Sequence, residues 1–189
     1  MDPISFYILA HLYRAGIDYA RSMAKMSGVL QDEIEKRLRE LEKDGLVEKV
    51  TGTSVKRSDA RFKLSYEVHK HHTYYSLTRE GKHLLRELKS NIEMYFSKTT
   101  GFDFTFKLLS LLSRCGCEHV GMLAKLLSAS RSDVDTAVKR LKDLGLVAEC
   151  RGKVIKRKHR KAKVKGETRT HHTYYTTSRL TDMLFRHLS

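Results

Sequence analysis

The chain contains one unit of sequence twice, at a fixed offset of one hundred residues. The pentapeptide His-His-Thr-Tyr-Tyr at 71–75 recurs at 171–175, and Gly-Leu-Val at 45–47 recurs at 145–147. Residues 4–88 align with 104–188 without a gap, and about 25 of the 85 positions are identical. Such a match in one register is hard to reach by chance, so we interpret the chain as one supersecondary unit used twice. The repeat predicts two domains, 1–98 and 99–189, each large enough to bury a core.

The two copies share the charge of the chain unequally. The whole sequence has 37 Lys and Arg against 22 Asp and Glu, a formal net charge of +15. Residues 1–100 hold 18 basic and 14 acidic side chains, whereas residues 101–189 hold 19 and 8. Because a strongly basic surface attracts polyanions, we expect an anionic partner that is bound mainly by the second copy.

Residue usage also indicates the environment of the protein. Its three cysteines, Cys115, Cys117 and Cys150, do not make a disulfide framework, which predicts reduced thiols and a cytoplasmic location. We find no apolar run of membrane-spanning length and no signal-peptide pattern, so no membrane partner is expected. Gln31 and Asn91 are the only side-chain amides, and their scarcity beside abundant Lys, Arg and Glu indicates a thermophilic source.

Hydrophobic periodicity predicts the same order of elements in both copies. The predicted elements of the first copy are helices ending before Gly16 and Gly28, a helix over 31–44, and strands over 46–50 and 68–77. Thr78 is a good N-cap for a long last helix, expected over 79–96, and residues 97–101 are the expected linker. The second copy repeats this order, with a shorter last helix.

Three helices, a hairpin and a further helix form the plan of a winged helix-turn-helix. Residues 41–47 resemble the end of the recognition helix in winged-helix transcription regulators. Residues 75–85 resemble the last wing strand and following helix of the same regulators, although the second copy has Thr181 in place of Gly81. The repeated His-His-Thr-Tyr-Tyr is similar to a family of uncharacterised archaeal winged-helix proteins. These resemblances imply two tandem winged helix-turn-helix domains, mainly α with small β-hairpins (α+β), from an archaeal source, and they bring no activity.

The strongest functional signal lies in the expected wing of the second domain, where ten side chains are basic and only Glu167 is acidic. The ten cations are Arg151, Lys153, Lys156, Arg157, Lys158, Arg160, Lys161, Lys163, Lys165 and Arg169. A cationic hairpin can follow a phosphate backbone or enter a minor groove, and we predict nucleic-acid contact here rather than a solvated loop. The first wing is basic but more dilute, with the cations Lys56, Arg57, Arg61 and Lys63.

The third helix of each copy is the expected recognition helix, whose first half faces the major groove in this fold class. Its outward positions in the second copy are Arg131, Ser132, Asp135, Thr136 and Lys139. Arg131 is suited to a guanine edge, and Ser132 or Thr136 to a phosphate or base.

In the first copy, three acids crowd the start of the equivalent helix: Asp32, Glu33 and Glu35. These carboxylates would repel phosphate. They also stabilise the helix, because negative charge interacts favourably with a helix N-terminus. Under either interpretation, we expect the first copy to bind DNA more weakly than the second. Its alternative role is a protein contact or a homodimer interface.

The repeated His-His-Thr-Tyr-Tyr leaves three interpretations open: packing, a polar or nucleic-acid contact, and metal binding. Adjacent side chains of a strand point to opposite faces, so His71 and His72 are poorly placed to chelate one ion together. We expect Tyr75 and Leu77 on the core face of the strand. His72 and Tyr74 should share the other face, open to phosphate or a partner.

Other candidate chemistry is weak. Cys115 and Cys117 with His119 are spaced more tightly than a zinc site and no second pair follows, which favours packing at a helix end. We find no phosphate-cradling glycine loop, nucleophile elbow or metalloprotease motif, so we expect no enzyme, no cofactor and no metal.

The sequence therefore predicts a DNA-binding protein, a transcription regulator or chromatin-associated factor. It would bind duplex DNA through the recognition helix and basic wing of the second domain. The alternatives are a protein-interaction module that docks onto a transcription or other macromolecular assembly, and an RNA-binding protein.

Overall fold

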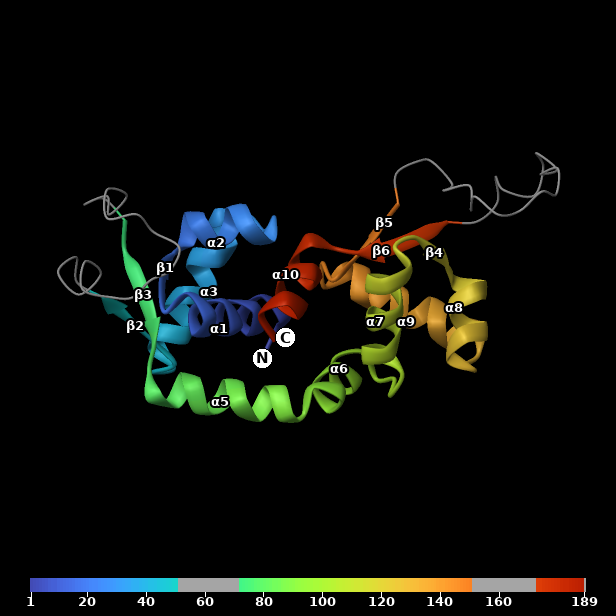
Figure 1. The fold of residues 1–189 in the computed structure, drawn as a ribbon, viewed down its shortest axis with the longest axis horizontal. Coiled ribbons are helices and arrows are strands. Elements are labelled where there is room, and N and C mark those ends of the chain that lie inside the picture. The colour runs from blue at the N-terminus through green and yellow to red at the C-terminus, as the bar shows by residue number, and fades with distance from the viewer. Residues whose placement is uncertain (51–71, 151–172, 189) are drawn as a thin grey trace. The chain divides into compact units, whose positions relative to one another are not determined.

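A computed structural model describes residues 1–50, 72–150 and 173–188 of the chain (Figure 1). The described residues form nine helices and six short strands, which make two three-stranded antiparallel sheets. The fold is thus mainly helical with small sheets, and each copy has the same order of elements. This confirms the predicted α+β class and the tandem repeat. No helix in the described ranges is long and apolar enough to cross a membrane.

The first copy follows the predicted order and adds one strand. Its elements are α1 (Pro3–Ala15), β1 (Ile17–Tyr19), α2 (Ala20–Ser27), α3 (Gln31–Lys43), β2 (Val47–Val50), β3 (Tyr74–Leu77), α5 (Arg79–Ser90) and α6 (Ile92–Thr100). The strand order is β1-β3-β2, so β3 lies in the middle and Asp18 and Lys49 flank Tyr75 on its two sides. Strand β1 was not predicted, because its three residues carry no visible alternation and their partners lie far along the chain.

Helix α1 is the centre of the first core. Residues 6–10 are all at most 1% exposed, so this stretch is buried on every side of the helix. Helices α3 and α5 and strand β3 all pack against α1, which explains why a helix with a weak polar face is stable here. Asp2 caps its first turn by accepting hydrogen bonds from the amides of Ile4 and Ser5.

The second copy repeats this plan. Its elements are α7 (Thr105–Cys115), β4 (Glu118–His119), α8 (Val120–Leu127), α9 (Arg131–Asp143), β5 (Val147–Glu149), β6 (Tyr174–Thr177) and α10 (Arg179–Leu188). The strand order is β4-β6-β5, the same as in the first copy. Leu108, Leu109 and Leu112 of α7 form its core with Val134 and Leu141 of α9, and all are fully buried.

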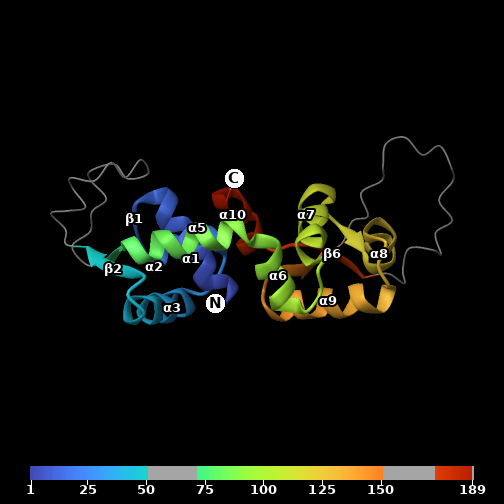
Figure 2. The ribbon, with the colours of Figure 1, turned by 90° about the horizontal axis from the view of Figure 1, so that it is seen from below.

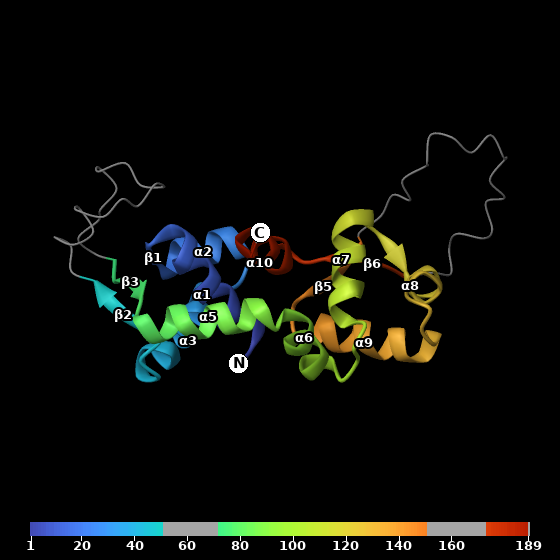
Figure 3. The same cartoon turned by 60° about the horizontal axis from the view of Figure 1, so that its bottom comes forward.

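The two compact units of the structure do not coincide with the two repeats. Unit 1 contains Met1–Tyr95 together with Ser178–Ser189, and unit 2 contains Phe96–Thr177. Helix α10, the last element of the second repeat, packs within unit 1 against α1 and α2 (Figures 1 and 3). The boundary expected at 98/99 separates the two repeats in the sequence. In the folded chain, however, the last helix of the second repeat belongs to unit 1.

One glycine accounts for part of this difference between the copies. Gly81, in the first turn of α5, packs so closely that a Cβ there would lie 2.1 Å from the carbonyl oxygen of Leu46. The second copy has Thr181 at the equivalent position, and Thr181 is fully buried in α10. A threonine cannot make the close approach that Gly81 makes, so α10 cannot dock as α5 does.

The long helix expected over 79–96 is wrong, because the helix is interrupted at Asn91. The backbone of Asn91 leaves helical angles, at φ −115° and ψ 32°, and its side-chain amide donates to the carbonyl oxygen of Glu87 at 3.2 Å. Such local bonding by asparagine competes with helix continuation, and α6 begins one residue later. Residues 97–100, expected to be a linker, belong to α6.

The expectation of three reduced thiols is also wrong. Cys117, just before β4, and Cys150, just after β5, form a disulfide. Cys115 is free and exposed. The positions of the bonded pair correspond to Ile17 and Val50 in the first copy, at the ends of the two strands that flank β3.

Candidate nucleic-acid interface

Helices α8 and α9 form a tightly connected pair in unit 2. Ser128 ends α8 in the left-handed conformation, and Ser130 caps α9 by accepting a hydrogen bond from the amide of Asp133 at 3.1 Å. Four residues of α9 are buried against the unit: Val134, Ala137, Val138 and Leu141. Their burial leaves the opposite face of α9 in solvent, along one edge of the unit (Figure 2).

The exposed face of α9 holds the four helix residues that the sequence predicted as binding residues. Arg131, Ser132 and Lys139 are exposed, and Thr136 is half-buried. Arg131 and Lys139 are eight residues apart, so they share one side of the helix, and Thr136 lies one turn after Ser132. The Lys139 ammonium lies 2.7 Å from Asp135, and the Thr136 hydroxyl donates to the backbone of Ser132 at 3.0 Å. Within the described ranges, the side chains of Arg131 and Ser132 form no hydrogen bond or ion pair.

Two further cations of α9 are engaged inside unit 2. Arg140 donates to the carbonyl oxygen of Thr100 and lies over the Phe102 ring, 5.8 Å from its centroid. Lys142 pairs with Glu149 on β5. These contacts hold α9 against its neighbours, so the cation best placed for a ligand is Arg131, at the start of the helix.

The equivalent helix of unit 1, α3, has a different charge pattern. It carries five carboxylates and four cations, with Asp32 exposed in the first turn. Arg37 lies 3.5 Å from Asp2, 3.0 Å from Glu33 and 2.8 Å from Glu40. Because three carboxylates surround this guanidinium, α3 presents a largely neutralised surface.

The two tyrosines of the repeated pentapeptide are buried in the first copy. Tyr75 and Leu77 are buried on the core face, as expected, and burial raises the pKa of Tyr75. Tyr74 is also buried, at 3% exposed, which corrects the expectation that it faces a partner. The cause is β1, whose Tyr19 ring stacks on His72 at 4.4 Å and meets Tyr74 edge-on at 5.4 Å.

The second copy has a similar ring contact, although Tyr174 and Tyr175 are only half-buried. His119 occupies the position of Tyr19 and meets Tyr174 edge-on at 5.5 Å. Its Nδ1 also accepts from the amide of Met122 at 3.3 Å, so it caps α8. His119 and Cys117 are thus engaged in a cap and a disulfide. The described residues contain no group of three or more side chains placed to hold a metal ion.

The cations predicted on the two wings lie outside the described residues. They are Arg151, Lys153, Lys156, Arg157, Lys158, Arg160, Lys161, Lys163, Lys165 and Arg169 in the second copy, and Lys56, Arg57, Arg61 and Lys63 in the first. Strands β5 and β6 are antiparallel neighbours, so the basic segment between them connects adjacent strands.

Sequence reasoning missed a buried polar cluster in unit 1 that joins His11, Asp18 and His187. His187 lies in the second repeat, so its contact with His11 spans 176 residues. The one available signal was the comparison of the copies. The second copy has Leu111 where the first has His11, an unusual change for a helix core.

One family of known proteins matches most of the chain. Residues 1–88 and 100–188 each match a family described as uncharacterised proteins conserved in archaea, DUF2250. Neither a curated protein nor a solved structure matches the chain. The two matches coincide with the two copies defined by the hundred-residue offset. The chain therefore belongs to this family of proteins conserved in archaea, and it contains the family's unit twice.

Proposed function

We propose that the protein binds duplex DNA, as a transcription regulator or chromatin-associated factor, and that it has no catalytic role. The observation that carries the proposal is the exposed start of α9, where Arg131 and Ser132 project from the first turn beside the helix N-terminus. An arginine at this place can form a bidentate contact with guanine, and backbone amides at a helix N-terminus favour phosphate.

The order of elements supports a winged helix-turn-helix in each repeat. In that fold the second helix of the tight pair enters the major groove, and the strands that follow bear the wing. In each repeat, the pair of helices is followed by two strands: α2 and α3 precede β2 and β3, and α8 and α9 precede β5 and β6. The ten cations of 151–169 lie between β5 and β6, where the wing of such a domain is found.

Unit 2 carries the proposed DNA contact because the two exposed helices differ in charge. The acids of α3 disfavour phosphate, and its central Arg37 is paired with carboxylates. This surface favours a protein contact for unit 1, which is the second candidate function. The test must therefore separate the two helices.

The binding test uses the full chain and fluorescence anisotropy with duplex DNA, duplex RNA and single strands at several salt concentrations. Duplex DNA is expected to bind most tightly. Arg131→Gln should change the preference among DNA sequences, since a bidentate guanine contact is worth about 1–3 kcal/mol of discrimination. Arg39→Gln on α3 removes the same charge from an equally exposed helix surface, and should leave both affinity and preference unchanged.

The second wing is expected to bind through phosphate with little sequence selection. Replacing Lys156, Arg157 and Lys158 with alanine should weaken binding similarly on unrelated duplexes. It should also flatten the slope of log affinity against log salt, by roughly 0.9 for each phosphate that the variant no longer neutralises. Replacing Lys56 and Arg57, the first-copy equivalents, should have the smaller effect. An unchanged salt slope in the triple variant would place the protein-interaction function first, and tighter binding of duplex RNA would favour the RNA alternative.

A further inference from the structure

Unit 1 has a cationic hollow that the proposed DNA contact does not use. Its volume is about 550 Å³, and its lining comes from α1, α5 and α10. The lining residues are Tyr13, Arg14, Lys89, Arg186 and His187. Three of these five side chains are cations and none is a carboxylate, so the hollow has the charge of an anion site.

The hollow exists because α10 docks in unit 1. The guanidinium of Arg14, in the last turn of α1, donates to the carbonyl oxygen of Arg186 in the last turn of α10. This bond brings the two arginines to one place. Helix α10, which supplies Arg186 and His187 to the hollow, belongs to unit 1.

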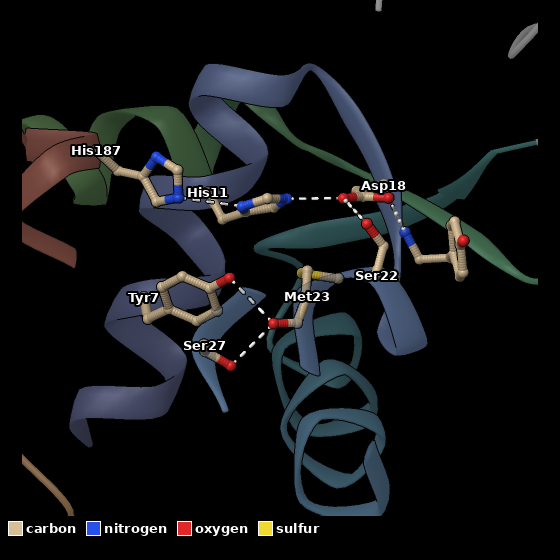
Figure 4. Close-up of polar contacts among 8 residues, drawn as sticks. Tyr7, His11, Asp18, Ser22, Met23, Ser27 and His187 are labelled. Carbon is tan, nitrogen blue, oxygen red and sulfur yellow. Dashed lines mark hydrogen bonds and ion pairs between the residues drawn. The ribbon is translucent and has the colours of Figure 1, made fainter. Parts of the chain in front are cut away.

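His187 lines the hollow and also contacts buried polar groups of unit 1, as Figure 4 shows for His11 and Asp18. Its Nε2 lies 3.2 Å from Nδ1 of His11, and Nε2 of His11 lies 2.8 Å from a carboxylate oxygen of Asp18. Asp18 also accepts from the hydroxyl of Ser22 and the amide of Tyr19, both at 2.8 Å. His11 is 3% exposed and Asp18 is 4% exposed, so this chain of contacts is shielded from water.

The other ring nitrogen of His187 is the unexplained group at this place. Its Nδ1 is buried, and it has no hydrogen-bond partner among the described residues. A buried polar nitrogen left without a partner is costly, so it marks a position where a ligand atom would be favourable.

The environment of His187 favours its neutral form. Burial, together with the neighbouring His11, Arg14 and Arg186, lowers the pKa of His187 to about 4. The groups facing it are Tyr7, His11, Tyr13 and Arg14 of α1, Lys89 of α5 and Arg186 of α10 itself. An anion among these cations would offset their repulsion and favour a proton on His187.

We propose that this hollow binds a small molecule through a multivalent oxyanion group. Arg186 and Lys89 pair with its oxygens, and Nδ1 of His187 donates one hydrogen bond to it. Protonated on both ring nitrogens, His187 also donates from Nε2 to Nδ1 of His11, and Nε2–H of His11 donates to Asp18. His187, neutral before binding, therefore takes up one proton from solvent when the anion binds, and this proton remains bound as long as the anion does.

The second copy provides a natural contrast. It has Leu111, Glu118 and Met122 where the first has His11, Asp18 and Ser22. The polar chain behind the hollow is thus specific to unit 1, although both copies share one plan. The proposed site is independent of DNA binding by α9.

Sulfate is the first probe, because it stays a dianion over the pH range of the test. Calorimetric titration of the full chain should show saturable binding that weakens by about tenfold in Arg186→Gln and in Lys89→Gln, as expected when a charged hydrogen bond is removed. The matched control is Arg114→Gln, an exposed arginine at the position equivalent to Arg14, which should bind as the wild type does. Both hollow cations are exposed, so these variants are expected to fold.

The proton uptake has its own readout. Sulfate affinity should rise as the pH falls from 7.5 to 5.5 in the wild type, and this rise should disappear in His187→Gln, whose folding circular dichroism can verify. Pyrophosphate and citrate, titrated on the same variants, separate a phosphoryl ligand from a carboxylate ligand. Equally weakened binding in Arg114→Gln and Arg186→Gln, or no saturable binding, would overturn the proposal. It would also fail if Arg186→Gln weakened duplex DNA binding more than Arg114→Gln does, because the hollow would then be part of the DNA contact.

Discussion

At the scale of single residues, side chains at equivalent positions of the two copies have different structural roles. Ile17 and Val50 are apolar in the first copy, and their counterparts form the Cys117–Cys150 disulfide. Leu30 precedes α3 without a capping side chain, and its counterpart Ser130 caps α9. A duplicated fold tolerates such exchanges because each position keeps its backbone role while its side chain is free to change.

His187 should make the stability of the protein depend on acid pH. Its pKa in the folded chain is lowered from 6.5 to about 4, mainly by burial. The unfolded chain therefore binds this proton at a higher pH than the folded chain does. The free energy of unfolding should fall as the pH is lowered from 6.5 toward 4, by at most about 1.4 kcal/mol per pH unit from this group.

Urea unfolding across that range tests the prediction. The variant His187→Asn should lose this part of the pH dependence, and His83→Asn, an exposed histidine of α5, should keep it. If His187→Asn has the same slope as the wild type, the histidine takes up its proton as easily in the folded chain as in the unfolded one.

At the scale of elements, helix ends differ more between the copies than helix interiors do. Helices α3 and α9 are each thirteen residues long and begin after equivalent positions. Leu30 has the extended backbone of an N-cap, at φ −60° and ψ 141°, but no side-chain oxygen to accept from the first turn. The first turn of α3 is therefore stabilised by its acidic side chains and by packing, whereas the first turn of α9 is stabilised by the hydrogen bond to Ser130.

Exchanging the caps should change stability in opposite directions. Ser130→Ala should cost about 1 kcal/mol of unfolding free energy, because it removes the acceptor for the amide of Asp133. Leu30→Ser should gain up to about 1 kcal/mol by providing one. Leu30 is 80% exposed, so its replacement gives up little burial. Denaturant unfolding of the two variants checks this, and effects of the same sign would contradict it.

At the scale of the whole molecule, the repeat and the folding unit are different things. By sequence α10 belongs to the second copy, and by packing it belongs to unit 1 with α1 and α2. Leu180 and Leu184 of α10 are buried there. The core of unit 1 is thus completed by residues almost two hundred positions from its beginning.

Hydrogen exchange should show which unit α10 stabilises. Leu184→Ala, at a fully buried site, should cost about 2–5 kcal/mol and lower the protection of amides in α1 and α2. Leu141→Ala, at an equally buried site of α9, should instead lower protection in unit 2. Reduced protection in α7 and α9 after Leu184→Ala would mean that α10 packs with its own repeat.

Features that depend on neighbouring residues and on the repeat could be predicted from the amino-acid sequence alone. Helical spacing of apolar residues located the first three helices of each copy, glycines marked where those of the first copy end, and Thr78 was identified as the cap of α5. The hundred-residue offset showed that the chain uses one plan twice. It also predicted an outward face for α9, on which Arg131, Ser132 and Lys139 lie exposed.

Features that depend on pairing between distant segments were settled only by tertiary folding. Strands β1 and β4 form only against partners more than fifty residues away, and Tyr74 is buried only because β1 brings Tyr19 over it. The disulfide, the docking of α10 and the contact of His187 with His11 likewise join residues whose spacing carries no local period. The periodicity of a sequence shows which face of a helix or strand is apolar, but it does not show which other element packs on that face. In this protein, α10 packs on α1, and this packing creates the cationic hollow.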